Sequence, residues 1–224
     1  MKKIPNLSCI LFLSIAVSSC YTLSLNQTGK TVGNGNTSVQ AAAGLLGISE
    51  IGDENESEDH GYDMPKVQVY QGITDRLDVG FILGTNKNGF VSKYQFAGNQ
   101  ESKFAMAGGL NAFLGLKDFG SSVDAEGMLG VEIPLFISFH PHELVSIYSN
   151  PTFIFLSVDD EVDILKERFY ASGPYKGLAS GIQLNFPIND KGATIIPNME
   201  ISWSSPLYSN KYIFNLGFGV GVKF

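Results

Sequence analysis

The C-terminal segment of the chain alternates strictly between apolar side chains and side chains that are small or polar. Read back from Phe224, the apolar set is Val222, Val220, Phe218, Leu216, Phe214 and Tyr212, and the other set includes Lys223, Gly221, Gly219, Gly217 and Asn215. Successive side chains of a β-strand point to opposite faces. The segment therefore predicts a strand with one apolar face and one small, wet face.

The same period of two recurs upstream, in residues 77–84, 123–139, 181–188 and 195–203. The chain is 44% hydrophobic but only 17% charged, whereas an ordinary soluble domain is roughly a quarter charged. After the N-terminal leader it has no apolar run of the 18 or so residues that a membrane helix needs. Segments of about ten residues with this period of two are typical of transmembrane β-barrels. A soluble β-sandwich or a lipocalin also shows this alternation.

Turn residues divide the chain into about ten strands. Counts from about eight to about twelve are also possible, because the 122–157 stretch can be divided into strands in more than one way. We expect strands near 37–47, 66–73, 77–85, 90–97, 103–115, 122–139, 144–157, 177–188, 193–204 and 211–224. Short polar connections mostly alternate with longer ones, as in a barrel with tight turns at one rim and loops at the other. An even strand number also lets the last strand pair with the first.

The N-terminus has the features of a secretory leader. Lys2 and Lys3 precede a short apolar core at residues 9–16, and the small residues Val17-Ser18-Ser19 end at Cys20. Such a leader lies outside the fold. The four residues 17–20 resemble the lipobox of bacterial lipoproteins, which implies cleavage after residue 19 and acylation of Cys20. An ordinary leader with an incidental cysteine is the alternative.

Two longer motifs make the resemblance to a family more specific. The segment Asn215-Leu-Gly-Phe-Gly-Val-Gly-Val-Lys-Phe224 looks like the closing strand of bacterial outer-membrane β-barrel proteins, and Tyr70-Gln-Gly-Ile-Thr-Asp-Arg-Leu-Asp-Val-Gly80 is similar to one of their periplasmic hairpins. The resemblance implies an all-β, antiparallel up-and-down transmembrane barrel over 37–224. It implies that Phe224 carries the signal read by the barrel-assembly machinery, and that the outer membrane is the location.

On this interpretation residues 1–19 are the lipoprotein signal peptide and 20–36 are a linker from the acylated Cys20 to the barrel. Removing residues 1–19 takes away Lys2 and Lys3 and no acid, so the net charge of −7 becomes −9. Residues 50–64 contain seven acids and no Lys or Arg. Nucleic acid is therefore disfavoured as a partner, because binding to phosphates needs positive charge.

The polar faces of the strands predict a narrow, polar lumen, because barrel diameter grows with strand number. The charged residues expected to face it are Lys66, Asp78, Lys93, Asp124, Glu126, Glu132, Glu200 and Lys223, with further polar residues such as Gln68, Asn111, Asn198 and Asn215. They would form either a salt-bridged core that closes the barrel or a polar pathway, which the excess of acids would make cation-selective. We favour the closed core.

Chemistry-bearing residues are few. His60 lies in the acidic stretch, and His140 and His142 flank Pro141 in an expected turn. The acids of 50–64 do not follow the EF-hand spacing, and the sequence has no Gly-x-Ser-x-Gly motif. We expect no enzyme activity, cofactor or metal.

The function expected is a structural or surface-interaction role among outer-membrane lipids, with a possible small solute or surface partner. The alternatives are a narrow channel, then a lipid-modifying enzyme or a periplasmic ligand-binding lipoprotein. Aromatic residues near the outer strand ends, Trp203, Tyr208, Tyr212, Tyr170 and Tyr175, are expected to form an interfacial girdle.

Overall fold

A computed structural model of the chain describes residues 27–50, 59–84, 87–117, 126–158, 172–188, 193–207 and 211–224. The strands are β1 (Thr37–Glu50), β2 (Asp59–Thr74), β3 (Leu77–Gly84), β4 (Asn88–Ala97), β5 (Phe104–Lys117), β6 (Glu126–His142), β7 (Val145–Val158), β8 (Gly173–Leu184), β9 (Phe186–Pro187), β10 (Thr194–Pro206) and β11 (Lys211–Lys223). Within these residues no helix is long and apolar enough to cross a membrane.

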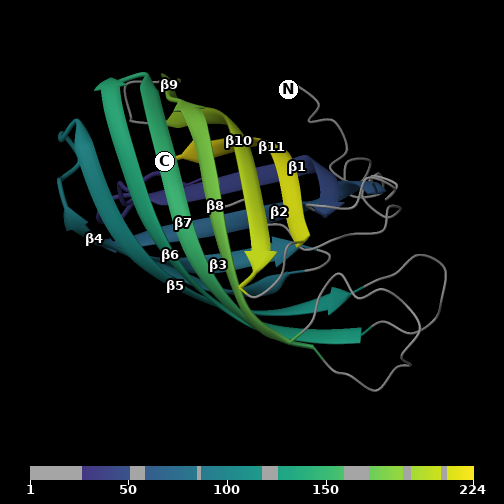
Figure 1. The fold of residues 1–224 in the computed structure, drawn as a ribbon. Coiled ribbons are helices and arrows are strands. Elements are labelled where there is room, and N and C mark those ends of the chain that lie inside the picture. Colours follow the sequence, from purple (N-terminus) through teal and green to yellow (C-terminus); the bar gives the residue numbers. More distant parts are fainter. Residues whose placement is uncertain are drawn as a thin grey trace, which may run out of the picture.

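The strands form one closed antiparallel barrel (Figure 1). Each strand pairs with its neighbour in the chain, and β11 closes the cylinder by pairing with β1. The strands β8 and β9 occupy a single position, because both pair with β10 and only Asn185 interrupts them. The barrel therefore has ten strand positions, and the expected fold class and strand count are confirmed.

Every expected strand is present, and the two that differ most are β1 and β2. Both continue toward the loop end of the barrel, where Gly44 pairs with Asp63 and Ile48 pairs with Asp59. Half of the segment expected to be an acidic loop, including His60, is thus strand. The hydrophobic alternation does not predict this extension, because Tyr62 and Met64 are the only apolar or aromatic residues in 59–64, too few to mark the face of a strand.

The strands are strongly staggered around the barrel. Lys223 pairs with Ser38 and Ser38 pairs with Tyr70, and the row of partners continues strand by strand to Tyr175 and Pro206. Lys223 ends β11 whereas Pro206 ends β10 at the opposite rim. Figure 1 shows the resulting oblique course of the strands, which is the tilt that closure of a barrel requires.

The two faces of the barrel are those that the alternation predicts. The outer face carries exposed large apolar side chains on every strand from β1 to β11, among them Leu45, Phe81, Phe90, Leu110, Ile133, Phe153, Ile201, Phe214, Phe218 and Val220. The inner face carries buried polar side chains and small residues. An exposed apolar belt is the kind of surface that faces lipid hydrocarbon. Closure of the sheet leaves no unpaired backbone edge, which a structure in hydrocarbon also requires.

The expected aromatic girdle is only partly present. Trp203 and Tyr212 lie against each other on neighbouring strands, with ring centroids 6.3 Å apart. Tyr175 is a correction: its side chain is 2% exposed and faces the interior of the barrel. Tyr175 precedes the strand expected from residue 177, so the alternation does not assign it to a face, and aromatic character alone does not choose one. Tyr170 and Tyr208 lie outside the described residues.

The segment expected to be a linker is more than a spacer. From Gln27 to Val32 the chain lies inside the barrel, and Gln27, Thr28, Thr31 and Val32 are buried there. Residues 33–36 then turn into β1: Gly35 donates a backbone hydrogen bond to Gly72, and Gly72 donates one to Asn36. We call residues 27–32 the plug. Cys20 and the leader 1–19 lie outside the described residues.

Candidate functional site in the barrel lumen

The lumen of the barrel holds most of the charged residues that the sequence pointed to. The side chains of Lys66, Lys93, Glu132 and Glu200 are each at most 3% exposed. Asp124 lies outside the described residues, and Glu126 begins β6 with a side chain that is not described. Phe224 ends the barrel wall, where its backbone exchanges two hydrogen bonds with Thr37, and its side chain is exposed.

A first charged cluster joins β3 and β4 to the plug. The Lys93 ammonium lies 3.3 Å from Asp78 Oδ2 and donates hydrogen bonds to Gln27 Oε1 and to the backbone oxygen of Lys30. Both carboxylate oxygens of Asp78 accept from the backbone N–H of Val32, at 3.1 and 2.9 Å. The ion pair therefore binds the plug through backbone groups as well as through side chains.

Neutral side chains hold the rest of the plug. Gln95 accepts from the backbone N–H of Thr31, Ser138 accepts from that of Gly29, and Asn150 donates to the carbonyl of Gln27. These partners come from β4, β6 and β7. Since a buried backbone group without a partner is costly, the lumen supplies the hydrogen bonds that an irregular segment cannot make within itself.

One apolar contact completes the seating of the plug. Val32 is buried in a cluster with Tyr70, Ile82 and Val91. These three side chains project inward from β2, β3 and β4. Val32 is the one large apolar residue of the plug, and its burial in a mostly polar lumen fixes the depth of the segment.

A second charged cluster lies nearer the opposite rim. The Lys87 ammonium lies 2.5 Å from Glu132 Oε1 and 4.6 Å from the centre of the Phe113 ring. Asn111 donates to the second oxygen, Glu132 Oε2, at 3.0 Å. Lys87 was not among the expected lumen residues because it precedes β4. Extending the parity of Lys93 and Gln95 back along the chain would have placed it inward.

The histidines of the predicted turn do not form a metal site in this structure. His140 lies in β6, and its two ring nitrogens are 2.8 Å from Ser138 Oγ and 2.7 Å from Ser146 Oγ. His142 accepts from the backbone N–H of Leu144. Across the described part of the chain, no group of three His, Cys, Asp or Glu residues is placed to hold a metal ion. His60 pairs with Gly47 in the β1–β2 ladder.

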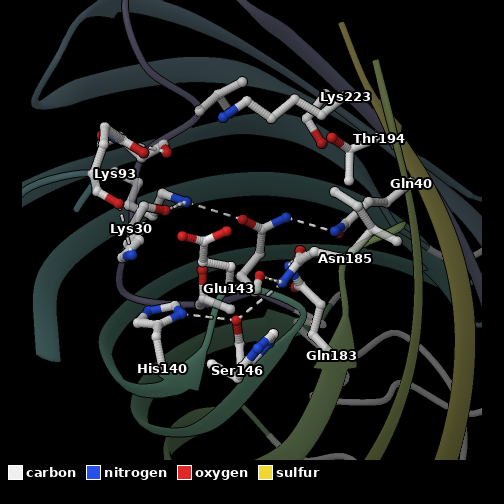
Figure 2. A pocket seen from close by; sticks show the side chains of 18 residues that line it. Lys30, Gln40, Lys93, His140, Glu143, Ser146, Gln183, Asn185, Thr194 and Lys223 are labelled. Carbon is white, nitrogen blue, oxygen red and sulfur yellow. Dashed lines mark hydrogen bonds between the residues drawn. The ribbon is translucent and has the colours of Figure 1, made fainter. Parts of the chain in front are cut away.

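A cavity of about 250 Å³ lies beside the plug at the barrel end that carries the short turns (Figure 2). Its lining includes plug residues, the ends of β1, β10 and β11, and the turn between β6 and β7. Gln27 accepts a hydrogen bond from Lys93 and donates one to Gln40. Figure 2 shows His140 directed toward Ser146. Elsewhere in the lumen, the Lys87–Glu132 cluster and tightly packed glycine positions fill the space: an added Cβ at Gly219 would lie 2.5 Å from Asn198 Oδ1.

Comparison with known proteins gives similarity of fold only. No family's sequence model matches this chain, and no curated protein matches it in sequence. Among solved structures it resembles Ail, the attachment invasion locus protein of Yersinia pestis, with 16% identity and a TM-score of 0.38, covering 85% of this chain and 99% of that one.

Two further structures resemble the chain at a similar level. Neisserial surface protein A matches with 15% identity and a TM-score of 0.36, over 85% of this chain and 100% of that one. The translocator domain of the autotransporter NalP from Neisseria meningitidis matches with 9% identity and a TM-score of 0.43, over 86% and 88%.

Proposed function

We propose that the chain is a bacterial outer-membrane β-barrel with a structural or surface-interaction role, and that its lumen is a closed polar core. The observation that carries the proposal is the filling of the lumen: the plug and the Lys87–Glu132 cluster occupy two successive levels. Buried charges are tolerated when they are paired and hydrogen-bonded. The exposed apolar side chains on the outer face are evidence for contact with membrane lipids.

Conductance separates this proposal from the alternative of a narrow channel. The purified chain, folded in detergent and added to a planar lipid bilayer, should give no regular conductance steps. Heat-dependent mobility in gel electrophoresis would show that the same sample is a folded barrel. Regular cation-selective steps from the folded sample would overturn the closed-core proposal and favour a channel.

We also propose that the chain is anchored by acylation of Cys20 and faces the cell surface with its loop end. The support is the lipobox-like sequence of residues 17–20 and the position of the plug, which enters the barrel at the rim where β1 begins. Incorporation of labelled palmitate should occur in the natural chain and be lost in Cys20→Ala. Incorporation that survives Cys20→Ala would contradict the anchor.

For assembly, we propose that Phe224 belongs to the signal recognised by the barrel-assembly machinery. Its exposed side chain and its backbone pairing with Thr37 at the seam of the barrel support the role. Phe224→Ala should lower the amount of barrel in outer-membrane fractions while the purified variant still refolds in detergent. Normal membrane yield for this variant would refute the role.

We propose no catalytic function. His140 is held between two serine side chains in the cavity wall, with Ser146 2% exposed, and such burial restricts access to a substrate.

A further inference from the structure

The cavity beside the plug has a charge distribution that the closed-core proposal does not use. Three lysines, Lys30, Lys93 and Lys223, contribute to its lining. They come from the plug, from β4 and from the last position of β11. In Figure 2, Lys30 and Lys93 lie together on one side of the cavity view and Lys223 lies across its upper part.

Only one of the three lysines forms an ion pair with an acid among the described residues. Lys93 pairs with Asp78, while Lys30 donates to the backbone oxygen of Gln100 at 2.7 Å. The Lys223 side chain makes no hydrogen bond or ion pair among the described residues, although the Asp78 carboxylate that pairs with Lys93 also attracts it. The one acid in the lining, Glu143, is exposed at the rim. The cavity therefore carries more positive than negative charge.

The surroundings make this positive charge unfavourable while the space holds no anion. Burial, and then the neighbouring Lys223 ammonium, lower the pKa of Lys30. Two ammonium groups that face one cavity repel each other, and an anion between them would offset the repulsion. The rest of the lining includes amide and hydroxyl groups from Gln183, Asn185 and Ser38, which are able to bind oxygen atoms.

The size of the cavity restricts the ligand. At about 250 Å³ the space is below the roughly 300–1,000 Å³ of pockets for drug-sized molecules. It suits a small molecule better than a polymer chain. The plug closes its inner side, where Lys93 is held by the plug itself.

We propose that this cavity binds a small oxyanion, a carboxylate or phosphate compound, between Lys223 and Lys30. Lys223 is the main contact because, among the described residues, its ammonium is engaged in no hydrogen bond or ion pair, and Asp78, which attracts it, is already paired with Lys93. Lys30 contributes a second charge from the plug. A bound ligand would therefore also help to hold the plug, residues 27–32, in the lumen.

The test is calorimetric titration of the folded full-length chain in zwitterionic detergent at low ionic strength, with inorganic phosphate and with succinate as probes. Saturable binding of at least one probe is expected, and the probe that binds identifies phosphate or carboxylate as the chemistry. A hydrogen bond to a charged group is worth about 1.5–3 kcal/mol, so Lys223→Gln should weaken binding about tenfold or more. Lys30→Gln should also weaken it.

Lys103→Gln is the matched control, since Lys103 is exposed at the same end and does not line this cavity. It should leave the affinity within about twofold. Lys223→Arg retains the charge and should still bind, which covers the case in which Lys223→Gln fails to fold. The proposal is wrong if neither probe binds the natural chain, or if the Lys103 control loses as much affinity as the cavity variants.

Discussion

Lys87 and Glu132 form an ion pair inside the barrel, with Nζ and Oε1 2.5 Å apart and both side chains at most 5% exposed. Lys87 immediately precedes β4 and Glu132 lies within β6, so the pair spans the intervening β5. Asn111 on β5 completes the link by its hydrogen bond to Glu132. Three adjacent strands are thus joined through one buried carboxylate.

The first prediction concerns this carboxylate. Lys87→Met should destabilise the folded barrel by about 3–5 kcal/mol, because it removes the ammonium group that pairs with the buried Glu132 carboxylate. The double variant Lys87→Met, Glu132→Gln should recover most of the loss, since the neutral amide oxygen still accepts from Asn111. Urea unfolding in detergent micelles, followed by tryptophan fluorescence, measures both.

Lys103→Met serves as the control, because Lys103 is exposed and its removal should change stability by less than about 1 kcal/mol. Equal losses in the single and the double variant would mean that the packing of the lysine stem, and not the pairing of charge, stabilises this level of the lumen.

Sequence reasoning located the barrel wall better than its contents. The two faces of the wall follow from alternation, because the period of two along each strand is set by burial on one face, and the turn residues between the strands predict about ten strand positions. Lys87 was missed because a turn has no period to read. The plug was missed for a different reason: a segment rich in Gly, Asn and Thr is equally compatible with a linker, and its seating depends on Asp78, Gln95 and Asn150, which lie far away in the chain.

The second prediction tests the close approach of the plug turn to β2. A Cβ added at Gly72 would lie against the backbone oxygen of Gly33 and the carbonyl carbon, the latter at 2.6 Å. Gly72→Ala should therefore displace the turn and loosen the plug. In a chain without Cys9 and Cys20, a cysteine introduced at Thr28 should react with a maleimide faster when Gly72 is alanine.

Gly127→Ala is the matched glycine control, because a Cβ there meets nothing within 4 Å. It should leave the labelling rate of Thr28→Cys unchanged. If Gly72→Ala also leaves that rate unchanged, the plug does not depend on the contact between Gly72 and Gly33.

The third prediction tests the lipid-facing belt by depth. Leu110 and Phe104 both lie on the outer face of β5, about half exposed, but Leu110 is mid-strand and Phe104 is its first residue. Leu110→Arg should cost about 2–4 kcal/mol in a bilayer, whereas Phe104→Arg near the interface should cost about 0–1 kcal/mol. Unfolding in lipid vesicles measures the difference in stability. Equal costs at the two positions would argue against β5 crossing a lipid bilayer.

The fourth prediction concerns closure of the lumen at two levels. Deleting residues 27–32 removes the plug but leaves Lys87, Glu132 and Phe113 in place. We therefore expect the deletion alone to give little conductance in planar bilayers. Combining it with Lys87→Ser and Glu132→Ser should give steady conductance, because both obstructions are then reduced to small side chains.

Each variant must first pass the heat-modifiability assay, so that an unfolded sample is not mistaken for a closed one. Steady conductance from the plug deletion alone would mean that the Lys87–Glu132 level is open, and that residues 27–32 are the barrier to ions. No conductance from the combined variant would mean that other lumen residues, such as Ser202 and Asn198 on the β10 side, fill the barrel independently of both clusters.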